Sequence, residues 1–219
     1  MKYNKMQNGF SDKGSMYLNL YMLKKVVWAS KKAIGLGTDY SKIISRAKTY
    51  DKLRMFKKAI HSYEQAVFIN PSNAEAYYSL GNTYSNAGMY KEAVNAYKRA
   101  IGNKSKYTEA LYRLSIAYGK LDRIKDAIDI TKRVIRIMPN MAAAHKNLGI
   151  FYGTSGSYRE AIAPLNKALE IDHDNADARS RLIQYYLKLN DKTSAKREHK
   201  ILQDISPHMA QELSHEIPK

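Results

Sequence analysis

The chain repeats a residue pattern every 34 positions. One series contains only tyrosine, at Tyr50, Tyr84, Tyr118, Tyr152 and Tyr186. A second contains only alanine, at Ala59, Ala93, Ala127, Ala161 and Ala195. A third is apolar throughout, at Ala66, Ala100, Val134, Ala168 and Leu202. A fixed period of this length indicates stacked supersecondary units, each of which buries its apolar face against its neighbours.

Residues 74–107 carry the spacing of one known repeat family. The matching positions are Tyr77, Leu80, Gly81, Tyr84, Gly88, Tyr90, Ala93, Tyr97 and Ala100. On these residues the chain resembles the tetratricopeptide repeat (TPR) family, with five repeats at 40–73, 74–107, 108–141, 142–175 and 176–209. The resemblance implies an all-α fold, a right-handed α-solenoid of five helical hairpins. First helices would line its concave side and second helices its convex side.

Gly81 falls in the middle of an expected helix, where glycine costs about 1 kcal/mol relative to alanine. It is at position 8 of its repeat, and Ala47, Ser115 and Gly149 occupy the same position in other repeats. Small residues there, and alanine at position 20, predict a close approach between the two helices of each hairpin. Burial of apolar side chains, at about 1.5–3 kcal/mol each, outweighs the local cost. Ile183 takes position 8 of the fifth repeat, so we expect different packing there.

The two ends of the chain lie outside the repeats. Residues 1–39 are a basic segment, in which 16–34 has the periodicity of an amphipathic helix. The basic and aromatic side chains of that helix are Tyr21, Lys24, Lys25, Trp28, Lys31 and Lys32. At the other end, Ser206 and Pro207 are expected to begin a short helix, and residues 210–219 form a C-terminal cap or tail.

The helix at 16–34 has three alternative uses. Its apolar side could cap the first repeat. Lysines interleaved with tyrosine and tryptophan also suit an anionic membrane surface. As a third use, the helix could enter the groove of a neighbouring copy, and such head-to-tail contacts would produce a homo-oligomer.

Polar side chains of the first helices are predicted to face the concave groove. The residues expected to bind a partner there are Lys48, Tyr78, Asn82, Tyr112, Arg113, Lys146, Asn147, Arg181 and Gln184. Amides can bond to a peptide backbone, while lysine and arginine select acidic side chains, so the expected partners are proteins or peptides with acidic segments. A clamp for chaperone C-termini is excluded, because Asp177 stands where that subtype has a cation.

The composition restricts the other function classes. The chain has no cysteine, and its six histidines lack metal-ligand spacing, so we expect no enzyme activity, no metal and no cofactor. Residues 1–39 and 40–73 each carry seven basic and two acidic side chains, which places +10 of the formal charge of +17 in the first 73 residues. A basic field attracts anionic lipid, acidic protein or RNA alike. Nucleic acid is the least expected of these partners, because no nucleic-acid-binding motif is present.

The layout of the chain is similar to a narrower family, the magnetosome-associated TPR proteins of magnetotactic bacteria. The similarity lies in length, five repeats and a basic N-terminal segment with a Lys-Lys pair. Members of that family coat the magnetosome membrane as a self-assembling layer and recruit other proteins. The resemblance implies a non-catalytic scaffold that is cytoplasmic and peripheral on an intracellular membrane. A general bacterial TPR adaptor, or a basic TPR protein that binds RNA or anionic membranes, is the alternative.

Overall fold

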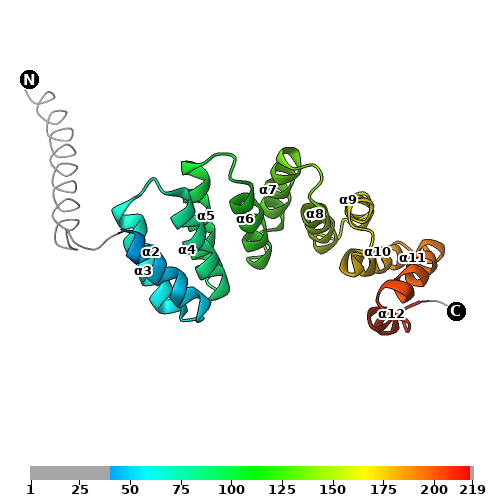
Figure 1. Cartoon of the computed structure of the whole chain (residues 1–219). Helices are drawn as coiled ribbons and strands as arrows, with labels where there is room; N and C mark the ends of the chain where they lie inside the picture. The colour runs from blue at the N-terminus through cyan, green and yellow to red at the C-terminus, as the bar shows by residue number, and fades with distance from the viewer. Residues whose placement is uncertain (1–39, 218–219) are drawn as a thin grey trace, which may run out of the picture.

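A computed structural model of the protein describes residues 40–217, which are helical and contain no strand (Figure 1). The helices are α2 (Tyr40–Lys52), α3 (Phe56–Ile69), α4 (Ala74–Asn86), α5 (Tyr90–Asn103), α6 (Thr108–Lys120), α7 (Ile124–Ile137), α8 (Ala142–Thr154), α9 (Tyr158–Ile171), α10 (Ala176–Lys188), α11 (Lys192–Ile205) and α12 (Pro207–Leu213). None of these helices is both long and apolar enough to cross a bilayer. The helix predicted over 16–34, with Tyr21, Lys24, Lys25, Trp28, Lys31 and Lys32, lies outside the described residues.

Consecutive helices form hairpins that stack along the molecule (Figure 1). Each first helix packs on the second helix of its hairpin, which packs in turn on the first helix of the next hairpin. First helices also contact one another, α4 with α6, α6 with α8 and α8 with α10. Within residues 40–217, successive second helices make no comparable contact. First helices therefore crowd on the inner side of the curve, and the expected all-α solenoid is confirmed.

Small residues set the distance between the helices of a hairpin. A Cβ atom added to Gly81 would lie 2.6 Å from Cε1 of Tyr97, a contact closer than real Cβ atoms make. A Cβ on Gly149 would lie 2.6 Å from Cγ of Leu165. Tyr97 and Leu165 are fully buried, as are the five alanines at position 20. The glycines thus leave room for a large side chain on the facing helix, which fills the hairpin core.

The fifth hairpin is packed differently, in line with the expectation for Ile183. This residue is fully buried and contacts a cluster that includes Ala195, Leu202 and two residues of α12. An ion pair lies nearby, with Arg179 Nη1 2.5 Å from Glu198 Oε2. Both side chains are about nine-tenths buried. None of the other four repeats has an ionised pair at these positions, and in the third repeat both residues are apolar, Leu111 and Ile130.

Helix α12 covers the open end of the fifth hairpin. Ser206 is at its N-cap and Pro207 is in its first turn, as expected, although the Ser206 side chain makes no capping hydrogen bond. Ala210 and Leu213 are buried against α10 and α11. The boundary predicted between residues 209 and 210 therefore falls inside a helix. The break comes earlier because proline cannot continue α11.

The turn inside each hairpin contains one residue with positive φ. In two hairpins this residue is glycine, Gly88 at 77° and Gly156 at 80°. In the other three it is Arg54 at 56°, Asp122 at 58° and Asn190 at 60°. Asparagine and aspartate tolerate this region because their short side chains bond locally, whereas arginine has no such advantage. Arg54 is therefore the least suited of the five residues to its backbone conformation.

Candidate partner-binding groove

First helices carry all nine side chains that were predicted to bind a partner. Lys48 belongs to α2, Tyr78 and Asn82 to α4, Tyr112 and Arg113 to α6, Lys146 and Asn147 to α8, and Arg181 and Gln184 to α10. Because first helices line the inner side of the curve, these residues follow one surface along the solenoid. Three hollows along this surface are lined by six of the nine residues. A fourth and smaller hollow, between α2 and α4, is lined by Lys48 again, together with Glu75.

The central hollow, of about 300 Å³, lies between α4, α6 and the connection that precedes α8. Its lining residues are Tyr78, Thr108, Glu109, Tyr112, Arg113, Met138 and Met141. The Tyr78 ring is fixed by two other rings, with centroid distances of 5.0 Å to Tyr107 and 6.2 Å to Tyr97. Burial raises the pKa of Tyr107 to about 12. The result is an aromatic and methionine-lined seat with one arginine and one glutamate beside it.

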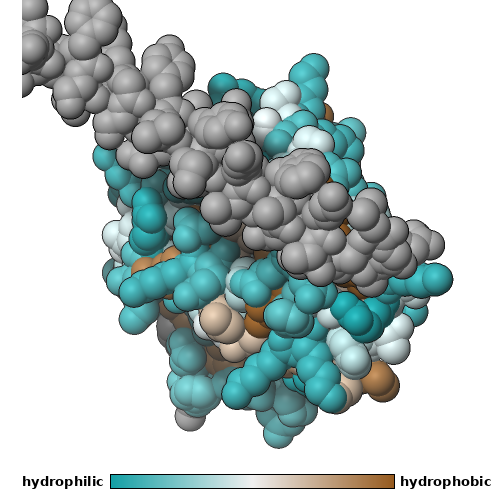
Figure 2. All heavy atoms as spheres, turned by 90° about the vertical axis from the view of Figure 1, so that its left-hand side faces the viewer, coloured by the Kyte–Doolittle hydropathy of each residue, from teal (hydrophilic) through white to brown (hydrophobic). Residues whose placement is uncertain are grey.

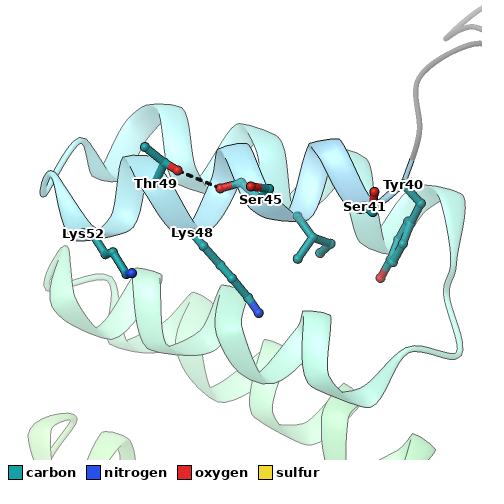
Figure 3. A pocket seen from close by; sticks show the side chains of 7 residues that line it. Tyr40, Ser41, Ser45, Lys48, Thr49 and Lys52 are labelled. Carbon is teal, nitrogen blue, oxygen red and sulfur yellow. Dashed lines mark hydrogen bonds between the residues drawn. The ribbon is translucent and has the colours of Figure 1, made fainter.

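The N-terminal hollow, of about 550 Å³, lies on α2. It is lined by Tyr40, Ser41, Ile44, Ser45, Lys48, Thr49 and Lys52. Tyr40, Lys48 and Lys52 extend from α2 to the same side (Figure 3). Lys48 and Lys52 make no ion pair within residues 40–217, so both charges are available to a partner.

The C-terminal hollow, of about 490 Å³, lies between α8 and α10. It is lined by Gly153, Thr154, Tyr158, Arg181, Gln184, Tyr185, Leu187, Lys188 and Glu216. Arg181 Nη1 donates a hydrogen bond to Gln184 Oε1 at 3.2 Å, so these two predicted residues contact each other. Basic side chains thus occur in all three of these hollows, and a glutamate lines two of them, Glu109 in the central hollow and Glu216 in the C-terminal one.

Asn82, Lys146 and Asn147 line none of the three hollows. Asn82 Oδ1 accepts a hydrogen bond from the Tyr97 hydroxyl at 2.8 Å. Asn147 Nδ2 donates to the Tyr112 hydroxyl at 3.3 Å, and Lys146 pairs with Asp177 at 3.2 Å. The structure therefore gives Asn147 a supporting position, in which it orients a tyrosine of the central hollow.

Sequence reasoning missed several residues of the central hollow. Met138 and Met141 lie in the connection between α7 and α8, outside the first-helix positions that the prediction considered. Thr108 begins α6 at position 1 of its repeat, also outside those positions, whereas Glu109 is at position 2, which the prediction included, and was not chosen. The sequence did contain a signal for the methionines. Met138 and Met141 flank Pro139 and Asn140 in a connection between helices, where polar residues are more usual.

Three of the six histidines of the described region bond to backbone carbonyl oxygens. His145 bonds to the carbonyl oxygen of Pro139 at 2.7 Å, and His173 to that of Leu169 at 2.6 Å. His199 bonds to the Ala210 carbonyl at 2.9 Å and so ties α11 to α12. Between residues 40 and 217, no three His, Cys, Asp or Glu side chains are grouped so that they could hold a metal ion.

Family profiles agree with the helical hairpins. The profile described as TPR repeat matches residues 56–88, and profiles described as tetratricopeptide repeat match 74–107, 109–140 and 142–175. Together these matches cover more than half of the 219 residues. The chain belongs to the tetratricopeptide repeat family. A search of curated proteins finds no sequence match to this TPR protein.

Solved TPR structures share its fold. YrrB, described as a TPR protein with an unusual peptide-binding site, is 25% identical with a TM-score of 0.71, over 84% of this chain and 96% of YrrB. A MamA structure is 23% identical with a TM-score of 0.73, over 78% of this chain and 94% of MamA. MamA residues 41 to the end from Desulfovibrio magneticus RS-1 are 17% identical with a TM-score of 0.74, over 79% of this chain and 98% of that one. Both MamA likenesses concern the fold alone.

Proposed function

We propose that this TPR protein is a non-catalytic scaffold that binds acidic segments of partner proteins in its concave groove. The observation that carries the proposal is the central hollow, where Tyr78, Tyr112 and two methionines form an apolar seat beside Arg113. An apolar side chain of the partner would fill the seat, and a neighbouring carboxylate would pair with the guanidinium. The peptide-binding site in the description of YrrB supports the same use of the fold.

Reversal of the charge at Arg113 tests this groove. We expect peptides selected from a random library on the full-length protein to contain an acidic residue next to an apolar one. Arg113→Glu should weaken their binding at least tenfold, about 1.4 kcal/mol, because a carboxylate would face the partner's carboxylate. Lys132→Glu, on the outer helix α7, should leave affinity unchanged in the same calorimetric titration. Equal losses for both variants, or none for Arg113→Glu, would exclude the central hollow as the binding site.

We further propose that the protein assembles with copies of itself and coats an intracellular membrane. Support comes from the hollow on α2, which offers a seat to an apolar helix at the N-terminal end of the groove. Residues 16–34 of a neighbouring copy have the required apolar stripe, and head-to-tail docking of this kind propagates from copy to copy. The resemblance to magnetosome-associated TPR proteins favours the magnetosome membrane as the surface that is coated.

Removal of the N-terminal segment tests assembly and membrane attachment together. Full-length protein should scatter light as an oligomer and should sediment with anionic vesicles in a salt-sensitive manner. A chain that starts at Asp39 keeps the five repeats, and we expect it to be monomeric and to lose most of its vesicle binding. Identical masses for the two chains would contradict self-assembly through this segment. Equal sedimentation would contradict its role in attachment.

A further inference from the structure

The turn between α2 and α3 presents apolar side chains to solvent. Leu53 is 62% exposed, the highest value among the large apolar side chains that are exposed in residues 40–217, and Met55 is 36% exposed. Met89, in the corresponding turn of the second hairpin, is 39% exposed. Because successive hairpins stack in the same orientation, these turns follow one edge of the solenoid. Figure 2 looks onto the end formed by α2 and α3, and its coloured surface is mostly hydrophilic with separate apolar patches.

This turn lacks two stabilising features, a glycine at the positive-φ position, which two of the other four hairpin turns have, and a side-chain N-cap, which one of them has. Arg54 has a φ of 56°, at the position that Gly88 and Gly156 occupy in other hairpins. Met55 is the N-cap of α3 and makes no side-chain capping bond, whereas Asp191 caps α11 by accepting from the Ser194 N–H at 3.0 Å. Residues that cost local stability often mark a functional contact.

Cations surround the exposed leucine. Lys52, Arg54, Lys57 and Lys58 are exposed, and none makes an ion pair in the described part of the chain. Asp51 is the acidic neighbour and is partly buried. The Arg54 guanidinium carbon lies 5.9 Å from the centre of the Phe56 ring, and Lys58 Nζ lies 5.7 Å from that of Tyr50. The segment 51–58 therefore has a net charge of +3 around an apolar tip.

The exposed apolar tip of the α2–α3 turn favours a lipid bilayer over a protein as its partner. Leu53 is more than half exposed and, like Arg54 and Met55, lines none of the hollows described above, so the apolar tip faces away from the groove. A projecting tip needs a complementary cavity in a protein partner, whereas lipid deforms around it. Apolar side chains flanked by lysine and arginine are typical of contact with the headgroup region of anionic bilayers.

We propose that the α2–α3 turn is a membrane-contact site. Leu53 and Met55 enter the headgroup region of an anionic bilayer, and the three cations that line no hollow of the groove, Arg54, Lys57 and Lys58, bind lipid phosphates. This site is distinct from the groove and from residues 1–39, so it adds a second contact to the proposed coat. The second contact fixes the orientation of the solenoid, with the α2–α3 turn at its N-terminal end toward the membrane and the fifth-hairpin turn away from it.

A fluorophore at position 53 tests the insertion directly. The chain has no cysteine, so Leu53→Cys introduces one thiol for an environment-sensitive dye in the full-length protein. Leu189→Cys is the matched control, because Leu189 is an exposed leucine at the same position of the fifth hairpin. Vesicles of phosphatidylcholine with phosphatidylglycerol should shift the emission of the dye at 53 to the blue and leave the dye at 189 unchanged. A dye at 53 that stays in water while the protein sediments overturns the proposal and leaves attachment through residues 1–39 intact.

Substitutions that stabilise the turn provide the second measurement. Arg54→Gly removes an unfavourable conformation and Met55→Asp supplies an N-cap, so each should raise the Tm. The double variant should nevertheless bind the same vesicles about tenfold more weakly, since it loses a cation and an apolar anchor and gains a carboxylate. Loss of binding therefore cannot result from unfolding. Unchanged vesicle binding, or an equal loss of binding to soluble polyglutamate, would show that the turn is not a lipid site.

Discussion

Replacing Arg179 with leucine should lower the free energy of unfolding by about 3 kcal/mol. The side chain is nine-tenths buried, its Nη1 bonds to Glu198 at 2.5 Å, and its Nη2 donates to the His173 carbonyl oxygen at 3.0 Å. Without it, Glu198 is left as a buried carboxylate, and breaking a buried pair costs about 3–5 kcal/mol. The lower figure applies because Arg197 Nε still bonds to Glu198 Oε1 at 3.1 Å. Urea unfolding followed by far-UV circular dichroism measures the loss.

The third hairpin supplies the control for this prediction. Leu111 and Ile130 occupy the positions that correspond to Arg179 and Glu198, and both belong to one apolar cluster. Since apolar residues often replace a buried ion pair without loss, Arg179→Leu combined with Glu198→Ile should be at least as stable as the natural protein. A double variant as unstable as Arg179→Leu alone would show that the loss has another origin than the unpaired carboxylate.

Gly81→Ala should lower the free energy of unfolding by about 1–2 kcal/mol, although alanine is the better helix former. The new methyl group would lie 2.6 Å from the Tyr97 ring, which is fully buried and whose hydroxyl bonds to Asn82. The ring therefore cannot move aside without breaking that bond. Overpacking costs about 1–3 kcal/mol and exceeds the gain of up to about 1 kcal/mol in helix propensity. Thermal and urea unfolding of the variant measure the net effect.

Gly102→Ala is the matched control for Gly81→Ala. Gly102 lies in the second helix of the same hairpin, and a Cβ there would meet no atom within 4 Å. The same substitution should therefore stabilise the protein by about 0.5–1 kcal/mol through helix propensity alone. If both alanine variants were stabilised, glycine at position 8 would not be needed for packing between the helices.

The sequence predicted those features that the 34-residue period repeats. Alanine at position 20 and the small residue at position 8 recur because every hairpin has the same close approach, and the structure has both inside the hairpin cores. The helical hairpins and their stacking followed from this pattern. Among the groove residues, Tyr78, Tyr112 and Arg113 were chosen by position alone, and they line one hollow.

Features that depart from the 34-residue period could not be predicted from the sequence. Arg179 and Glu198 are 19 residues apart, and either taken alone is typical of a solvated surface, so their burial as a pair depends on three-dimensional packing. Met138 and Met141 join the central hollow because the α7–α8 connection folds over it, which periodicity does not describe. The unfavourable conformation of Arg54 likewise became visible only in the backbone angles.

The absence of comparable contacts between successive outer helices within residues 40–217 has a mechanical consequence. A stretching or bending force can separate successive second helices without removing buried side chains from their partners. The solenoid should therefore bend easily about the contacts between its first helices. Its radius of curvature, and with it the spacing of the hollows along the groove, can therefore change at small energetic cost. Compliance of this kind fits the proposed binding of partner segments of unequal length.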